Sequence, residues 1–414
     1  MWESLATTRR QDRVLHGGAM VLNVFVGLVI APLWLLGQKL TAPLQRLLGR
    51  IDSEPPALPT PEPREGGMSE LIERLEAIPQ SLDPKPTALL RQGLADLSSF
   101  VFAQQREAAN IGYSYPRQFE DHVFEGADGE HIAATVGLHA RPRPGLIVVH
   151  GLFSSRRFDY VRRIAVSAYY EWGFNVAAID LRSFGLTNHT SQAPTTTGWK
   201  EGEDVIACAR YLKSLGSTTV AAIGISLGGS AVLGASHPEG ADEALDGGIL
   251  AVSPPADPRA IAKRLSKRVP PSHPAYLINR GNWALLTSRI REGRWEGIDD
   301  FLDPIEKVSA PYYEVSPDEL WERSAAVNHI AGAKVPVLIL HPVDDWLIPV
   351  SHARWLAEAA ADNDLVRVWE LPAGGHGGLE AIDPTWTRAV MRGFCEHWAG
   401  YANQPSPAAA KVKG

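Results

Sequence analysis

Apolar residues along this chain change their spacing near residue 117, and the change divides the sequence into two parts. Before it, SELIERLEAI and ALLRQGLADLSSFVFAQQ carry apolar positions three and four residues apart, which is typical of amphipathic helices. After it, short aliphatic and β-branched runs alternate with helical stretches. We therefore expect a small helical region at 68–114, followed by a main domain of alternating strands and helices.

The main domain begins with a predicted hairpin, because RQFEDHVFE and HIAATVGLHA flank the turn sequence GADGE. Six later runs predict further strands: GLIVVH from 145, FNVAAID from 174, TTVAAIGIS from 218, GGILAVS from 247, VPVLILH from 335 and LVRVWEL from 365. Continuous apolar runs separated by helices are typical of a parallel sheet that is covered on both faces. The pattern predicts a doubly wound α/β fold whose eight-stranded, mostly parallel sheet starts antiparallel.

One interval interrupts the alternation. Between Ser253 and Val335 no segment has a clear strand pattern, and the distance is too long for an ordinary connection. We expect an inserted lid at 255–330, which divides the core domain into 115–254 and 331–400. Its aromatic residues suit either an apolar pocket or a small core of the insert itself: Trp283, Trp295, Phe301, Tyr312, Tyr313 and Trp321.

The N-terminal segment 1–50 contains an uncharged stretch at 14–37, and its length matches the roughly 20 apolar residues that cross a bilayer. We expect membrane association through this single hydrophobic helix. The alternative is a helix that docks on the main domain of a cytoplasmic protein. A cleaved signal peptide is not expected, because the stretch exceeds the roughly 7 to 15 apolar residues of such peptides. Prolines and acids at 51–67 predict a linker, and 401–414 reads as a loose tail.

Composition excludes several classes of function. A net charge of −7 and a pI near 6.0 argue against a nucleic-acid-binding surface, which needs clustered Lys and Arg. Only two cysteines are present, Cys208 and Cys395, so a disulfide framework is not expected. The sequence contains no H-E-x-x-H, G-x-G-x-x-G or G-x-x-x-x-G-K motif, and we expect neither a metal nor an organic cofactor.

A candidate nucleophile stands at the end of the third predicted parallel strand. Ser226 lies between Gly224 and Gly228 in GISLGG, at the point where the strand gives way to a helix. A serine at such a sharp turn needs small residues two positions before and after it, so that strand and helix can approach. The motif predicts a nucleophile elbow. The simpler interpretation is a tight turn with an uninvolved serine.

Two more strands end in residues that could activate this serine. Asp344 and Asp345 follow VPVLILH, and His376 follows LVRVWEL in the glycine-rich loop PAGGHGG. A serine hydroxyl needs an adjacent base, and the base needs a third group that orients it. The order Ser, Asp, His matches groups carried by successive strands of one sheet.

The sequence also offers a place for the negative oxygen of a tetrahedral intermediate. In this architecture one backbone N–H follows the nucleophile, here Leu227, and another comes from the loop after an earlier strand. VVHGLFSS supplies that loop, with Leu152 or Phe153 as the donor, and we take Leu152. We expect His150 to organise the loop, and Phe153 and Trp346 to contact the substrate.

These segments resemble those of α/β-hydrolases over residues 115–400, with HGLFSS, GISLGG, HPVDDWLIP and GGHGG carrying the resemblance. The lid segment WEGIDDFLDPIEKVSAPYYEVSP is similar to that of the membrane-associated esterases, which include medium-chain ethyl ester synthase/esterases and acylglycerol or phospholipid lipases. The family's acid precedes a proline by four residues, as Asp345 precedes Pro349. The resemblance implies an α/β-hydrolase fold with the triad Ser226, Asp345 and His376.

The expected activity is that of a serine carboxylesterase or lipase, which hydrolyses small-molecule esters with an apolar acyl group through an acyl-enzyme. The hydrophobic stretch and the aromatic lid favour a lipid-like ester, and a soluble small ester is the alternative substrate. Two alternatives remain open. In the first, an alcohol or thiol replaces water, and the protein is an acyltransferase. In the second, the chain is a membrane-tethered binding protein that keeps the fold without turnover.

Overall fold

The computed structural model describes residues 66–82, 115–270 and 297–399, together with residues 279, 280, 282, 283, 286 and 287. The expected membrane helix at 14–37, most of the linker and of the helical region, and the tail at 401–414 lie outside these residues. The described part of the helical region contains α3 (Met68–Glu76). Among the described residues, no helix combines the length and apolar character that a membrane span requires.

Eight strands of the described chain form one sheet in the order β1-β2-β4-β3-β5-β6-β7-β8. β1 and β2 pair in antiparallel fashion, as do β2 and β4, and every other neighbouring pair is parallel. The strands are β1 (Phe119–Glu125), β2 (His131–Gly137), β3 (Arg143–Val149), β4 (Asn175–Ile179), β5 (Ser217–Ile225), β6 (Ile249–Val252), β7 (Val337–Pro342) and β8 (Val366–Leu371). The predicted fold is confirmed, including its antiparallel start.

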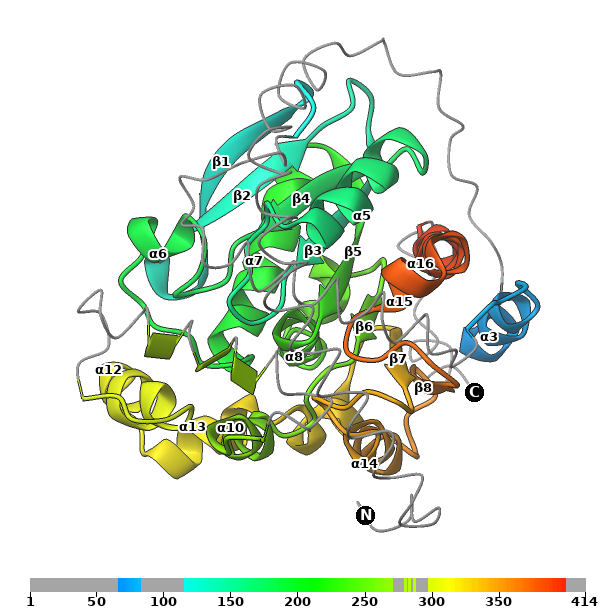
Figure 1. Ribbon diagram of the computed structural model, residues 1–414. Coiled ribbons are helices and arrows are strands. Elements are labelled where there is room, and N and C mark those ends of the chain that lie inside the picture. The colour runs from blue at the N-terminus through cyan, green and yellow to red at the C-terminus, as the bar shows by residue number, and fades with distance from the viewer. Residues whose placement is uncertain are drawn as a thin grey trace, which may run out of the picture.

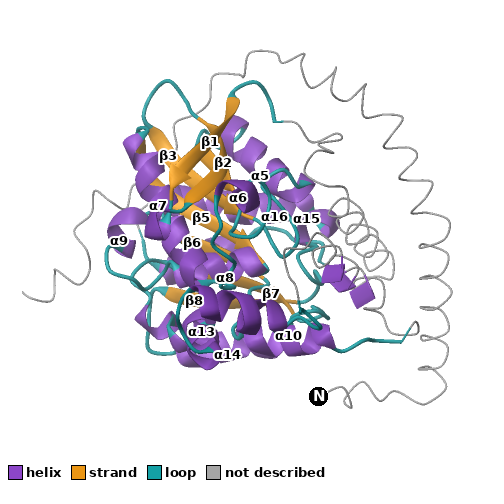
Figure 2. Cartoon of the chain, turned by 90° about the vertical axis from the view of Figure 1, so that its left-hand side faces the viewer, coloured by secondary structure: helices purple, strands orange, loops and turns teal. Residues whose placement is uncertain are grey.

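Helices cover both faces of the sheet (Figures 1 and 2). One apolar cluster joins the sheet to α3, α5 (Asp159–Tyr170) and α16 (Pro384–Trp398). The other joins it to α7 (Trp199–Ser214), α8 (Leu227–Gly234) and α14 (Ser351–Ala359). Short helical turns complete the connections: η2 (Ala127–Gly129), α6 (Thr187–Thr190), α9 (Ala241–Ala244), η5 (Ile330–Gly332) and α15 (Leu379–Ile382). This layering explains the uninterrupted apolar runs of the central strands.

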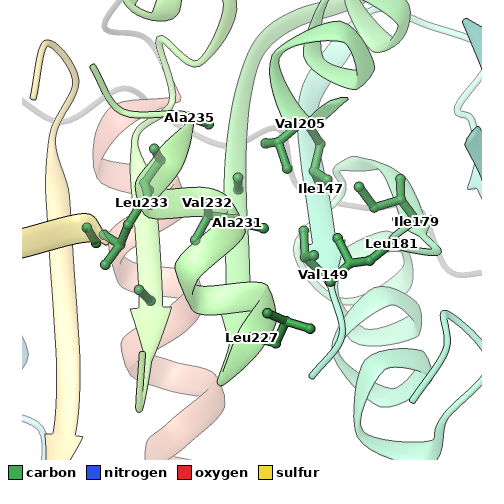
Figure 3. Packing of buried hydrophobic residues seen from close by; sticks show 14 of the residues in the cluster. Ile147, Val149, Ile179, Leu181, Val205, Leu227, Ala231, Val232, Leu233 and Ala235 are labelled. Atoms are coloured by element: carbon green, nitrogen blue, oxygen red, sulfur yellow. The ribbon is translucent and has the colours of Figure 1, made fainter. Parts of the chain in front are cut away.

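Helix α8 follows the central strand β5 and is held in place by packing. Its sequence LGGSAVLG has poor helix propensity at the glycines and the serine, so tertiary contacts must supply most of its stability. Leu227 and Val232 are buried in the same cluster as Val149 of β3 and Ile179 of β4 (Figure 3). Full burial of each such aliphatic side chain contributes roughly 1.5–3 kcal/mol. The start of α8 is therefore firmly anchored on the sheet.

The interval between β6 and β7 contains no strand in its described part. It contains helices α10 (Pro258–Ser266), η3 (Pro304–Ser309), α12 (Ala310–Tyr312), α13 (Pro317–Ser324) and η4 (Ala326–Asn328), and α10, α12 and α13 lie along one edge of the molecule (Figure 1). Phe301 and Trp321 are buried in the cluster that also contains sheet residues, whereas Tyr312 is 47% exposed. The core of the insert is therefore continuous with the core of the main domain.

Both cysteines are buried and free. Cys208 lies in α7 and Cys395 in α16, on opposite faces of the sheet, so they do not pair with each other. Burial raises the pKa of each thiol far above its usual value. Neither thiol has the thiolate character that a reactive cysteine needs.

Candidate active site

The turn between β5 and α8 places Ser226 at the carboxyl edge of the sheet. Its backbone angles, φ 58° and ψ −119°, are strained for a residue with a side chain. A Cβ on Gly224 would lie 2.1 Å from the carbonyl oxygen of Gly228, and a Cβ on Gly228 would lie 2.4 Å from that of Val149. Strand, turn and helix therefore approach so closely that only glycine fits at both positions, as the sequence motif predicts.

Replacing Gly224 by alanine is expected to destabilise the fold by about 3 kcal/mol or more, because the added methyl group meets backbone atoms that cannot rotate away. Urea unfolding measures this loss, and hydrolysis of a nitrophenyl ester should fall with it. Gly332→Ala is the matched control, since nothing lies within 4 Å of its added Cβ. Wild-type stability and activity of Gly224→Ala would contradict the geometry of the turn.

His376 joins Ser226 to Asp345. Its Nε2 lies 3.0 Å from Ser226 Oγ, and its Nδ1 lies 3.0 Å from Asp345 Oδ2. The other carboxylate oxygen of Asp345 accepts backbone N–H groups from Leu347 at 3.0 Å and Ile348 at 2.9 Å. These bonds fix the carboxylate, and the carboxylate fixes the ring. The geometry is that of a base poised to take the serine proton.

The two adjacent acids of the loop after β7 have different contacts. Although burial alone would raise it, the pKa of Asp345 is held below its usual value by the charge and hydrogen bond of His376. Asp345 is therefore ionised at neutral pH. Asp344 instead accepts the backbone N–H of Gly375 at 2.8 Å, and so fastens the loop that carries His376. Of the two acids, the structure brings Asp345 to the imidazole of His376.

A second histidine, His341, lies behind the carboxylate. It is fully buried, its Nε2 donates to the carbonyl oxygen of Ile348 at 2.9 Å, and the same nitrogen is 4.0 Å from Asp345. Burial lowers the pKa of His341, which keeps the ring neutral. The backbone N–H of Ile348 also donates to Asp345. The bond from His341 to Ile348 therefore helps to keep the 345–348 turn in its conformation.

A third histidine, His352, lies at the start of α14, directly after the loop that carries Asp345. It connects this part of the chain to the segment that precedes α10. Its Nδ1 accepts backbone N–H groups from Ala256 at 3.2 Å and Asp257 at 3.4 Å. Burial, which penalises the charged ring, lowers the pKa of His352 from 6.5 to about 4. The folded protein therefore needs this ring neutral.

The unfolding free energy is expected to decrease as the pH falls from 6.5 to 4. Between these values unfolded His352 binds a proton and folded His352 does not, so acid favours the unfolded chain, by about 3 kcal/mol from this residue at pH 4. Urea unfolding over this range measures the slope. In His352→Asn an amide oxygen replaces the accepting nitrogen but does not titrate, so the slope should be shallower. An unchanged slope would contradict the assignment.

The loop after β3 presents free backbone donors beside the serine. Leu152 and Phe153 donate to no acceptor among the described residues, and Leu227 begins α8, where a backbone N–H has no partner within its own helix. His150 accepts the backbone N–H of Leu181 at 3.0 Å on Nε2 and donates from Nδ1 to Gly151 O at 2.7 Å. His150 thus organises the loop, as expected, and its ring is occupied at both nitrogens.

The two residues expected to contact substrate lie in different loops, Phe153 after β3 and Trp346 after β7. The ring of Trp346 lies 6.4 Å from that of His376, and its main-chain oxygen accepts a hydrogen bond from Arg264 of α10 at 2.7 Å. Phe153 is buried, with its ring 6.1 Å from that of Phe184 and 6.4 Å from that of Phe301. An aromatic residue of the insert therefore packs directly against the loop after β3.

Comparisons with known proteins place these features in a wider group. A model described as the alpha/beta hydrolase family matches residues 146–390. A curated protein of Bacillus anthracis, provisionally named an Xaa-Pro dipeptidyl-peptidase, is 29% identical over 94 residues, which are 21% of this chain and 15% of that relative. The alignment thus spans well under two thirds of the relative's length.

Solved structures of two enzymes are also similar. An esterase of Pyrococcus furiosus is 19% identical, with a TM-score of 0.49 over 68% of this chain and 93% of that one. A puromycin-hydrolyzing peptidase of Mycobacterium tuberculosis is 18% identical, with a TM-score of 0.47 over 69% of this chain and 40% of that one.

Proposed function

Since the chain belongs to the alpha/beta hydrolase family, we propose that it is a serine hydrolase of carboxylic esters. The observation that carries this proposal is the position of His376, 3.0 Å from the hydroxyl of Ser226 and 3.0 Å from the carboxylate of Asp345. A partly exposed base with these two partners has the arrangement that activates a serine.

The reaction proceeds in two halves. His376 takes the proton of Ser226 as Oγ attacks the ester carbonyl, and then gives that proton to the departing alcohol, which leaves an acyl group on Ser226. Water attacks the acyl-enzyme with the same ring as its base, and this step releases the acid and restores the serine. Asp345 holds the imidazole in the Nδ1–H tautomer and stabilises the cation that forms in each half.

The oxygen that becomes negative in each tetrahedral intermediate needs fixed donors. We assign this role to the backbone N–H of Leu227 and of Leu152, with Phe153 as the alternative in the loop after β3. One such donor typically contributes about 2.7–4 kcal/mol of barrier stabilisation. Because the donors are backbone groups, side-chain substitution of these residues does not remove them.

Aromatic side chains on the insert, on the loop after β3 and beside His376 support an ester with an apolar acyl group. Phe301 packs on Phe153 beside the oxyanion loop, Trp283 lies 5.3 Å from Phe301 between ring centroids, and Trp346 stands next to His376. Apolar walls with few polar groups favour an acyl chain over a charged one. The substrate class we propose is therefore a small, lipid-like ester.

A series of 4-nitrophenyl esters with lengthening acyl chains tests this proposal, run beside dipeptide 4-nitroanilides as peptidase substrates. We expect turnover of the esters, with kcat/KM rising from the acetate to medium chains. Faster cleavage of the anilides would make the protein a peptidase, and a strong preference for the acetate would remove the lipid-like class. Added alcohols that capture most of the acyl group would identify an acyltransferase. Failure to turn over any substrate, with no labelling of Ser226 by a fluorophosphonate, would leave a binding protein.

We also propose that the apolar stretch at 14–37 attaches the protein to membranes. An arginine near the middle of a spanning helix costs roughly 2.5–3.5 kcal/mol of insertion free energy. The double variant Val26→Arg and Val29→Arg should therefore move the protein from the membrane pellet to the supernatant after high-speed centrifugation. An unchanged distribution would favour a helix that docks on the catalytic domain.

A further inference from the structure

A tyrosine outside the triad is bonded to the loop that offers the oxyanion donors. Tyr160, the second residue of α5, accepts the backbone N–H of Gly151 at 2.8 Å, and its hydroxyl donates to Ser154 Oγ at 3.2 Å. Burial raises the pKa of Tyr160, so the phenol keeps the proton that it donates. One side chain is thus hydrogen-bonded near both ends of the loop at 150–154.

The hydrogen bond between Tyr160 and Gly151 lies beside Ser226. A Cβ built on Gly151 would be 3.3 Å from Ser226 Cβ and 3.5 Å from the Tyr160 hydroxyl, so the serine and the phenol flank the same glycine. Phe153, two residues further along, has a φ of 54°. This backbone conformation is unfavourable for a residue with a side chain, so surrounding contacts must maintain it. Contacts around Gly151 therefore set the shape of the loop where it meets the substrate.

The direction of the Leu152 N–H follows from these bonds. In a planar trans peptide the C=O of one residue and the N–H of the next point in opposite directions. The carbonyl oxygen of Gly151 is held by His150 Nδ1 at 2.7 Å and by the backbone N–H of Ser154 at 3.3 Å. Tyr160 accepts the N–H of the preceding peptide, between His150 and Gly151, and donates to the hydroxyl of Ser154. Together they leave the Leu152 N–H facing away from the bonded carbonyl.

We propose that Tyr160 is a positioning residue of this enzyme, which holds the 150–154 loop so that the Leu152 N–H meets the oxygen of the tetrahedral intermediate. The inference rests on the proposed serine hydrolase function and assigns Tyr160 no contact with the reacting atoms. Its effect is exerted on the transition state, where the oxyanion exists, and only weakly on the bound ester.

The direct test is Tyr160→Phe, which keeps the ring and removes the hydroxyl. We expect kcat for 4-nitrophenyl butyrate to fall about 10- to 100-fold, with KM within threefold of the wild type, because a misdirected donor loses part of the 10²- to 10³-fold that a deleted one costs. Affinity for phenylboronic acid, whose serine adduct places an oxygen at the oxyanion position, should fall by a similar factor. Tyr169→Phe is the matched control, because Tyr169 lies on the same helix and its hydroxyl donates to Leu138 O at 3.3 Å.

Ser154→Ala provides a second variant. It removes the acceptor of the phenol but leaves the Gly151 bond, so kcat should fall about 3- to 10-fold. Hydrogen exchange of peptides that contain residues 150–154 should be faster in both variants than in the wild type and in Tyr169→Phe. Hydrogen exchange measures the stability of the loop's hydrogen bonds, and it does not require the protein to turn over a substrate.

The outcomes separate this inference from the proposed function. If the wild type hydrolyses the ester and reacts with a fluorophosphonate at Ser226, the serine hydrolase stands. Tyr160→Phe with wild-type kcat and boronic acid affinity would then overturn the positioning role alone. A KM increase with unchanged kcat would also overturn it. If the wild type neither turns over nor labels, both proposals fall together.

Discussion

The Ser226→Ala variant is expected to hydrolyse nitrophenyl esters about 10⁵- to 10⁶-fold more slowly than the wild type, while remaining folded. Alanine removes the oxygen that would form the acyl-enzyme, and only the oxyanion donors and substrate binding remain to assist water. The backbone of the turn is unaffected, since alanine carries the same Cβ as serine. Initial rates at saturating ester, with thermal unfolding as a check on the fold, measure the effect.

Ser230, one turn further along α8, is the matched control for this substitution. Its hydroxyl donates to Pro255 O at 3.4 Å, in the segment that precedes α10, so Ser230→Ala should keep kcat within threefold of the wild type. If Ser226→Ala retained more than about a hundredth of wild-type activity, another residue would have to be the nucleophile. A similar loss in Ser230→Ala would indicate general damage to α8.

The second large effect is expected from Asp345→Asn, with kcat reduced about 10⁴-fold. The amide oxygen can still accept the backbone N–H groups of Leu347 and Ile348, so the loop should keep its shape. The amide carries no charge to stabilise the imidazolium of His376, and it no longer selects the Nδ1–H tautomer. A loss in kcat without a large loss of stability would distinguish the catalytic role from a structural one.

Asp344→Asn is the comparison that tests the choice between the adjacent acids. Its amide oxygen can keep the bond from the backbone N–H of Gly375, which is 2.8 Å long. We expect kcat within fivefold of the wild type. A larger loss in Asp344→Asn than in Asp345→Asn would exchange the roles of the two residues.

Most of the fold could be predicted because central strands are buried on both faces. β3, β4, β5 and β7 are uninterrupted apolar runs in the sequence and buried strands in the structure. The packing positions of the aromatic side chains in the insert were harder to predict. Phe301 and Trp321 join the core of the main domain, and nothing in their sequence spacing indicates which surface they cover.

The proximity of Ser226, Asp345 and His376 could be predicted because each residue follows a recognisable strand, and the carboxyl ends of parallel strands meet at one edge of the sheet. Tyr160 was not predicted. Its importance depends on how the first turn of α5 lies against the loop after β3, which is a tertiary contact without a sequence pattern. The same holds for His352, which reads as an ordinary helix residue but bonds the backbone of a distant segment.

The most direct test of a serine activated by His376 is the intact mass of the full-length protein after brief exposure to a fluorophosphonate, followed by peptide mapping. One adduct per chain on the peptide that contains Ser226 is expected, formed at least 10³-fold more slowly in His376→Ala. No adduct, an adduct on another residue, or equal rates in the two proteins would contradict the account.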